Sequence, residues 1–286
     1  MNTAIVLGGS GLLGQALVQR LICEGFEVLS PSREELNVLD FSALSDYLLS
    51  AFSSQKGNCA LFNCVAYTAV DKAEEEAELA LALNAQLPAR LGRLAQGKNV
   101  FLMHYSTDFV FNGLKSTPYT PQDATDPLCV YGASKLAGEK ALLELNLPNC
   151  AIARTAWLFG HGRKNFVRTI LTICEKQGFA KVVQDQVGSP TYASDLALYS
   201  LALAKSGQSG LFHVVNSGQT SWHGLAAQAA QLVGSSAVIE PVLAASLALP
   251  ARRPAYSVLD TGSFSAATGL VPRPWQAALQ EYLTLV

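Results

Sequence analysis

The chain has 286 residues, of which 50% are hydrophobic and 15% are charged. A chain of this size can bury one large core, or one core with a smaller satellite domain. Its 20 basic and 22 acidic residues leave a formal net charge of −2, which favours neither nucleic acid nor an anionic membrane as a partner. The six scattered cysteines are expected to be reduced, and the four histidines lack metal-ligand spacing, so no metal site is expected.

The apolar runs of the sequence are all short. None reaches the roughly 18 residues of a membrane helix. The first residues show neither the basic region nor the small-residue cleavage site of a secretory signal. We therefore expect a cytoplasmic protein without a membrane partner.

Short apolar runs alternate with longer amphipathic stretches through the first half of the chain. Strands are expected at Thr3–Leu7, Phe26–Leu29, Ala60–Val65, Val100–Tyr105 and Cys150–Thr155. Helices are expected at Leu12–Cys23, Phe41–Phe52, Ala73–Ala95 and Tyr131–Leu145. The strands are apolar almost throughout, which is typical of a parallel sheet covered on both faces. The alternation predicts an α/β fold with a Rossmann-type, doubly wound parallel sheet.

The pattern loosens after Trp157, where glycines and prolines become frequent. Further strands are expected at Lys181–Gln184 and Leu211–Val215, and further helices at Ala193–Lys205 and Ser221–Val233. We expect a dinucleotide-binding domain over residues 1–157, completed by residues 180–235. Residues 158–179 and 236–286 are expected to form a smaller substrate-binding lobe.

A glycine-rich loop joins the first strand to the first helix. It reads Gly8-Gly9-Ser10-Gly11-Leu12-Leu13-Gly14 and holds two overlapping glycine spacings, 8/11/14 and 9/11/14. Without side chains, the backbone amides of such a loop can approach a pyrophosphate, and the last glycine lets the helix pack closely on the strand. Glycines also serve ordinary turns, but the position between strand and helix favours dinucleotide binding.

The residues after the second strand bear on the choice of cofactor. Arg33 lies about 20 residues beyond the glycine loop, where an NAD enzyme usually carries an acidic residue for the ribose 2′-hydroxyl. A guanidinium suits a 2′-phosphate, so NADPH is preferred and NADH remains possible. The alternative is that Arg33 belongs to a surface turn. Asp40 and Phe41 follow the next short run and are expected to flank the adenine.

A tyrosine and a lysine spaced four apart, Tyr131 and Lys135, open a predicted helix and share one of its faces. Reduction of a carbonyl needs a proton on oxygen, which a tyrosine can donate if a nearby ammonium lowers its pKa. Such a pair alone is common on solvated helices. Ser106 and Thr107, at the carboxyl end of an upstream strand, add a hydroxyl that can bind the reacting oxygen.

Longer strings resemble the extended short-chain dehydrogenase/reductase superfamily and, within it, the dTDP-4-dehydrorhamnose reductase family. The matching stretches are residues 63–74, 105–111, 130–139, 154–157, 185–192 and 253–260. They are spread over nearly the whole chain. The resemblance implies reduction of the C4 keto group of dTDP-4-dehydro-L-rhamnose, a nucleotide sugar, with hydride from a nicotinamide.

The resemblance also implies residue roles. Tyr131 would donate the proton, Lys135 would activate it and hold the cofactor ribose, and Thr107 would be the third catalytic residue. Cofactor contacts would come from Gly11, Leu12 and Leu13 at the pyrophosphate, Asp40 and Phe41 at the adenosine, and Ala66, Tyr67 and Thr68 in the cleft. Substrate contacts would come from Thr107, Asp108 and Trp157.

Arg252 and Arg253 could meet the diphosphate of a sugar nucleotide through charge-assisted hydrogen bonds, or one could be a surface charge. We expect Arg253 to bind substrate. Some family members pair through a magnesium-bridged interface that uses carboxylates. The candidate positions here, around Gln15, Ala16 and Ser194, carry no acidic residue, so neither the metal nor that dimer is carried over. A homodimer stays open.

Two other functions remain open from the sequence. The same catalytic residues serve reductases of other nucleotide keto-sugars, because substrate choice rests on a few pocket side chains. A non-catalytic NADP-binding subunit is the second alternative, since the regulatory beta subunit of methionine adenosyltransferase resembles this family too.

Overall fold

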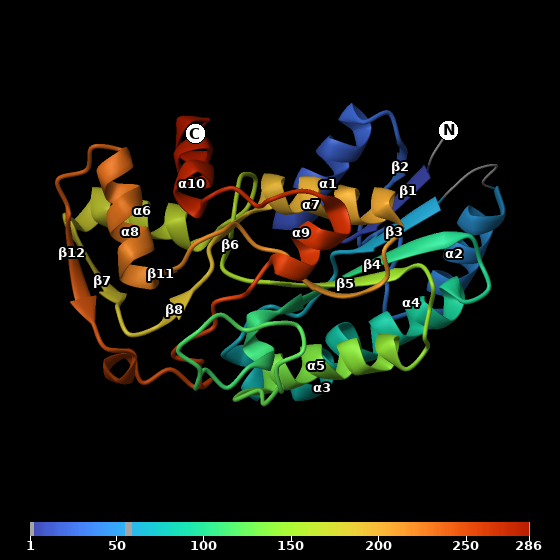
Figure 1. Ribbon diagram of the computed structural model, residues 1–286, viewed down its shortest axis with the longest axis horizontal. Helices are drawn as coiled ribbons and strands as arrows, with labels where there is room; N and C mark the ends of the chain where they lie inside the picture. Colours follow the sequence, from blue (N-terminus) through green and yellow to red (C-terminus); the bar gives the residue numbers. More distant parts are fainter. Residues whose placement is uncertain (1–2, 55–58, 286) are drawn as a thin grey trace.

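A six-stranded parallel sheet forms the centre of the computed structural model, which describes residues 3–54 and 59–285 (Figure 1). Its strands lie in the order β10-β5-β4-β3-β1-β2. Their bounds are β1 Thr3–Leu7, β2 Glu27–Leu29, β3 Cys59–Asn63, β4 Val100–Thr107, β5 Cys150–Thr155 and β10 Gly210–His213. Every neighbouring pair is parallel, so the Rossmann-type prediction is confirmed.

Helices cover both faces of this sheet, as strand β1 illustrates. Its alternate side chains Ala4 and Val6 join one core cluster, and Ile5 and Leu7 join another, because successive strand residues point to opposite faces. The first face is covered by α1 (Leu12–Cys23) and α7 (Ala193–Ser206), and the second by α2 (Phe41–Ser54), α4 (Leu87–Ala95) and α5 (Val130–Leu143).

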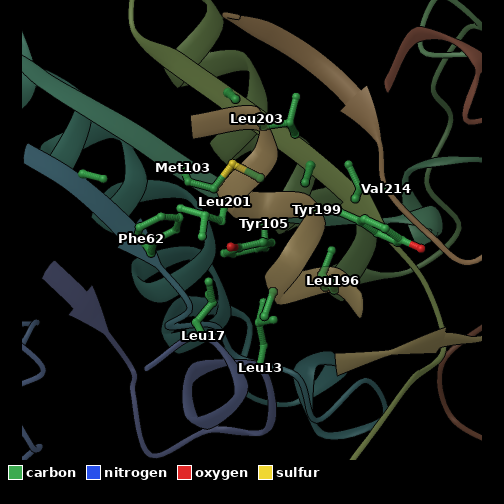
Figure 2. Close-up of a cluster of buried hydrophobic side chains, with 14 of the residues drawn as sticks. Leu13, Leu17, Phe62, Met103, Tyr105, Leu196, Tyr199, Leu201, Leu203 and Val214 are labelled. Atoms are coloured by element: carbon green, nitrogen blue, oxygen red, sulfur yellow. The ribbon is translucent and has the colours of Figure 1, made fainter. Parts of the chain in front are cut away.

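The first of these clusters is drawn in Figure 2. Leu13 and Leu17 of α1 point toward Phe62 of β3 and Met103 of β4, with α7 beside them. All four side chains are buried, and each such side chain contributes on the order of 1.5–3 kcal/mol to stability. This packing holds the amino end of α1, and with it the glycine loop, against the sheet.

The single helix expected at Ala73–Ala95 is wrong in detail. The chain there forms η1 (Lys72–Glu74), α3 (Ala77–Leu81), a π-helical turn η2 (Ala82–Gln86) and then α4. Asn84 explains the π turn, because its buried amide accepts from the backbone N–H of Tyr67 at 2.9 Å and donates to the Tyr67 carbonyl at 3.0 Å. A π turn commonly marks such a special contact.

A smaller lobe lies to one side of the sheet, at the left of Figure 1. Its strands β7 (Phe179–Val183) and β12 (Val238–Val242) pair in parallel, and helices α6 (Phe166–Gln177), α8 (Trp222–Leu232) and α10 (Trp275–Thr284) pack with one another or with these strands. Two short ribbons join β8 (Val187–Gly188) to β11 (Thr220–Ser221) and β6 (Leu158–Phe159) to β9 (Thr191–Tyr192). The elements still to be named are η3 (Asp108–Val110), η4 (Ala244–Leu247) and α9 (Gly262–Thr268).

These contacts differ in part from the expected domain limits. Within residues 180–235, α7 and β10 do complete the main sheet, but β7 pairs with β12 and α8 packs on α6. Within residues 236–286, α9 packs on α7 and β10. The division of the chain into two domains stays a prediction. Across the described residues, no helix combines the length and the apolar character needed to cross a membrane.

Candidate active site

A cavity of about 560 Å³ opens where the order of the sheet reverses, between β1 and β3. Ligands of doubly wound sheets bind at this switch point, beyond the carboxyl ends of the strands. The cavity is lined by Leu7, Gly8, Ser10, Gly11, Pro31, Ser32, Arg33, Leu36, Asn37, Val38, Leu39, Cys64, Val65, Ala66, Leu79 and Leu83. Its walls thus combine the glycine loop, the segment after β2 and the segment after β3.

The glycine loop uses both of its predicted spacings. Gly8 has φ +78°, a left-handed conformation that favours glycine. A Cβ on Gly9 would collide with the Ser30 side chain, and one on Gly14 would collide with the Gly8 carbonyl. Gly11 is the amino-terminal cap of α1 and carries no side chain, so the first N–H groups of the helix can meet an anion. The loop fits the pyrophosphate of a dinucleotide.

The segment after β2 supplies the far wall of the cavity. Ser32 and Arg33 line it, and the Arg33 side chain is exposed, so its guanidinium is accessible to a ligand. Asn37 and Val38 complete this wall, and the contact of Asp40 and Phe41 with the adenosine stays a prediction.

Asp40 and Phe41 lie at the start of α2. Asp40 accepts from the backbone N–H groups of Ser42 and Ala43, both at 3.1 Å, which makes it a helix cap. Phe41 packs against the core beneath α2. An acidic residue directly before an apolar helical repeat is a signal for the start of a helix. The residues that line the cavity, Asn37 and Val38, come before this start.

Three residues after β3 were predicted to contact the cofactor, and only one of them lines the cavity. Ala66 lines the cavity. Tyr67 is buried and its hydroxyl donates to the Glu76 carboxylate at 2.7 Å, so this side chain turns toward η1 and α3. The backbone N–H and carbonyl of Tyr67 are both hydrogen-bonded to the Asn84 amide. Thr68 is exposed and lies beyond the residues that line the cavity.

Lys135 is almost completely buried beside the carboxyl end of β4. Its Nζ donates to the Tyr105 carbonyl at 2.6 Å. Burial lowers the pKa of this ammonium to about 8, and the Glu139 carboxylate one turn along α5 opposes the shift. The structure therefore holds the lysine next to the strand end that carries Thr107.

Tyr131 lies one turn before Lys135 on α5. Burial raises the pKa of its phenol above the usual value, and the nearby Thr107 side chain opposes that rise. The phenol therefore stays protonated at neutral pH, ready to donate. The lowering of this pKa by Lys135 stays a prediction.

Asp108 is bound by two hydroxyl groups, one of them from Thr107. The Thr107 hydroxyl donates to one carboxylate oxygen at 3.1 Å, and the Ser257 hydroxyl donates to the other at 2.5 Å. The side chain is 2% exposed. Burial raises the pKa of this carboxyl to about 6, while the bonds from Ser257 and Thr107 oppose the rise. Thr107, Asp108 and Ser257 thus form one hydrogen-bonded row, with the Tyr131 phenol beside Thr107.

The raised pKa of the Asp108 carboxyl predicts that the stability of the protein depends on pH. Its pKa is about 6 in the folded chain and 3.8 ordinarily, so between these values the folded state binds more protons than the unfolded one. Its contribution to stability therefore falls as pH rises from about 4 to about 6 and is flat above. Urea unfolding of Asp108→Asn and wild type at several pH values should show the variant gaining about 2–3 kcal/mol relative to wild type between pH 4 and pH 7. A difference that does not change with pH would contradict this.

A buried ion pair lies behind the lysine, and sequence reasoning missed it. Arg154 of β5 donates to the two carboxylate oxygens of Glu139 at 2.9 and 2.6 Å, and the Ser106 hydroxyl donates to the same carboxylate. Both charged side chains are at most 3% exposed. The His213 ring lies 3.5 Å from the guanidinium. This pair ties α5, which carries Tyr131 and Lys135, to β4 and β5.

The other two residues predicted to bind substrate, Trp157 and Arg253, lie in different surroundings. Trp157 follows β5, at the same sheet edge as Thr107, because Thr155 pairs with Thr107 across the two strands. Arg253 donates to the Asp71 carboxylate at 2.8 Å and to the Ala251 carbonyl at 2.8 Å, so two of its nitrogens already have partners. Its contact with a substrate diphosphate stays a prediction.

Comparison with known proteins identifies the family of this chain. The family model for the RmlD substrate binding domain matches residues 1–286. The chain belongs to this family. A dTDP-4-dehydrorhamnose reductase from Streptomyces griseus is 39% identical over 97% of this chain and 91% of its own length. The resemblance inferred from the motifs is thereby confirmed.

Two further members of the RmlD family bear on cofactor and substrate. A crystal structure of dTDP-4-dehydrorhamnose reductase from Bacillus anthracis in complex with NADP is 29% identical, with a TM-score of 0.93 over 99% of both chains. A probable dTDP-4,6-dihydroxy-2-methyloxan-3-one 4-ketoreductase from Streptomyces antibioticus is 37% identical over 97% of this chain and 93% of its own length. These relatives are thus named for different substrates.

Proposed function

We propose that this protein reduces the C4 keto group of dTDP-4-dehydro-L-rhamnose to give dTDP-L-rhamnose, with NADPH as reductant. The observation that carries the proposal is the grouping of Thr107, Tyr131 and Lys135 at the same sheet edge as the dinucleotide cavity. The reaction belongs to the biosynthesis of nucleotide sugars for cell-surface polysaccharides. The proposal includes a cytoplasmic location and a nucleotide sugar as the partner.

The cavity and its loop fit a nicotinamide dinucleotide, which when bound supplies a hydride to the C4 carbon of the keto-sugar. The residues of the chain handle the oxygen. Tyr131, beside Thr107, donates a hydrogen bond to the carbonyl oxygen and transfers its phenolic proton as negative charge develops there. The Lys135 ammonium, held by the Tyr105 carbonyl, stabilises the phenolate that remains and is placed to hold the nicotinamide ribose.

The exposed guanidinium of Arg33 supports NADPH as the preferred cofactor. We expect Arg33→Ala to raise KM for NADPH about 10- to 100-fold, because a charge-assisted hydrogen bond contributes about 1.5–3 kcal/mol. KM for NADH, which has no 2′-phosphate, should change less than about twofold. Steady-state assays with both cofactors provide the internal control. An equal rise for both cofactors would instead assign Arg33 to the shared adenosine.

The proposal is tested by the loss of absorbance of the reduced nicotinamide. Purified protein is mixed with dTDP-4-dehydro-L-rhamnose that has been generated enzymatically, in parallel with NADPH and NADH. Rapid loss with formation of dTDP-L-rhamnose is the expected result. No loss with either cofactor, in protein shown to bind NADPH, would overturn the proposed substrate.

Reduction of another dTDP-bound keto-sugar is the second candidate. It is favoured by the similarity to the Streptomyces antibioticus relative, which is named for a different keto-sugar. A panel of dTDP-keto-sugars separates the two, since the highest kcat/KM identifies the substrate. The complete set of Thr107, Tyr131 and Lys135 speaks against the non-catalytic subunit.

A further inference from the structure

The start of α5, the helix that carries Tyr131, is held by a residue from a distant turn. The backbone N–H of Val130, the first residue of the helix, donates to the Glu74 carboxylate at 2.9 Å. The first N–H groups of a helix have no partner within it, so an acceptor from outside the helix can bond them. Cys129, which precedes the helix, is not one of the residue types that usually cap. Glu74 therefore supplies, from 56 residues away, an acceptor that a local cap would normally provide.

The turn that carries Glu74, η1, also packs against the Tyr131 side chain. Ala73, in the middle of this turn, is completely buried. It belongs to a small apolar cluster, and Val130 and Tyr131 pack against that cluster. One turn thus contacts the start of the helix in two ways, by a hydrogen bond at its first N–H and by apolar packing at its general acid.

The turn η1 is itself fixed in place. A backbone hydrogen bond of 2.9 Å joins the N–H of Ala73 to the Ala69 carbonyl. Asp71, directly before the turn, accepts from the Arg253 guanidinium at 2.8 Å. The pKa of the Asp71 carboxyl is lowered, chiefly by this bond, so the carboxylate stays charged at neutral pH. The position of Glu74 is therefore set by contacts that do not involve α5.

We propose that Glu74 is a positioning residue for the general acid, and that its carboxylate fixes the first turn of α5 so that the Tyr131 phenol meets the carbonyl oxygen of the substrate. The inference rests on the proposed function. Glu74 acts through the backbone of Val130 and does not touch the reacting atoms. A donor misplaced by about 1 Å can cost a reaction about 100-fold in rate, so a small movement of the helix start lowers kcat without weakening cofactor binding.

Kinetics of two Glu74 variants test this role. Glu74→Ala removes the acceptor and should lower kcat about tenfold, with rates referred to the concentration of sites that bind NADPH. KM for NADPH should change less than about twofold, because the glycine loop and Ala66 are untouched. Glu74→Gln keeps an oxygen that can accept from the Val130 N–H, so it should recover most of the lost rate.

Amide hydrogen exchange tests the contact without substrate. In Glu74→Ala, peptides that cover the start of α5 should exchange about threefold faster than in wild type, because the Val130 N–H has lost its partner. Peptides from α4 should exchange as in wild type. Glu74→Gln should again resemble wild type.

Glu75→Ala is the matched control. It also removes one negative charge beside η1, but the Glu75 side chain is exposed and forms no hydrogen bond or ion pair with the rest of the described chain. It should keep the kcat and the exchange of wild type. An unchanged kcat in folded Glu74→Ala would overturn this inference alone, as would an equal fall in Glu75→Ala or in Glu74→Gln. Absent turnover in wild type that binds NADPH would overturn the proposed function, and this inference with it.

Discussion

Replacement of Tyr131 by phenylalanine is expected to lower kcat by about 100- to 10,000-fold, because it removes the general acid and leaves the aromatic ring in place. The Kd for NADPH should change less than about twofold, since Lys135 and the glycine loop are untouched. Single-turnover assays measure the first quantity, and fluorescence titration with NADPH measures the second. The pairing of a large loss in rate with unchanged cofactor affinity is the signature of a proton donor.

Tyr47→Phe controls for the loss of a tyrosine hydroxyl. Tyr47 is a half-buried residue of α2, and its side chain packs against the core that this helix covers. Its replacement should leave kcat unchanged. If Tyr131→Phe lost rate and cofactor affinity together, Tyr131 would act mainly in binding and the proposed mechanism would be wrong.

The second large effect concerns stability. Arg154→Met should lower the free energy of unfolding by about 3–5 kcal/mol, because it leaves the Glu139 carboxylate buried without its cationic partner. The pair is bidentate, and both side chains are at most 3% exposed, so solvent does not screen the charge that remains. Urea unfolding followed by circular dichroism measures the change. Activity should fall as well, since Glu139 shares α5 with Tyr131 and Lys135.

The exposed ion pair of Lys205 and Glu24 is the matched control. Its closest nitrogen–oxygen distance is 2.7 Å, much like that of the buried pair, but its side chains are 55% and 32% exposed. Lys205→Met should therefore cost less than about 1 kcal/mol. Adding Glu139→Leu to Arg154→Met should restore part of the lost stability, because it removes the unpaired charge. A cost below about 1 kcal/mol for Arg154→Met alone would show that the pair is not buried in solution.

Local features of the sequence determined the first strand, the first helix and the catalytic spacing. Thr3–Leu7 and Leu12–Cys23 have the predicted bounds, because a run of apolar residues, a glycine loop and a helical repeat each act over a few neighbours. Tyr131 and Lys135 lie one helical turn apart for the same reason. The sheet class also follows, since strands without polar alternation need cover on both faces.

Contacts between distant residues decided the rest. Asn84 interrupts a predicted helix because its amide bonds with Tyr67, 17 residues away, and with Ser134, 50 residues away. The stack of Trp157 on Trp222 and the pair of Glu139 with Arg154 arise in the same way. Neither partner of such a contact carries a local signal, because burial and hydrogen bonding exist only once the chain has brought them together. The spacing of Tyr131 and Lys135 could be read from the sequence, whereas the residues that hold the site in shape could be found only in the folded chain.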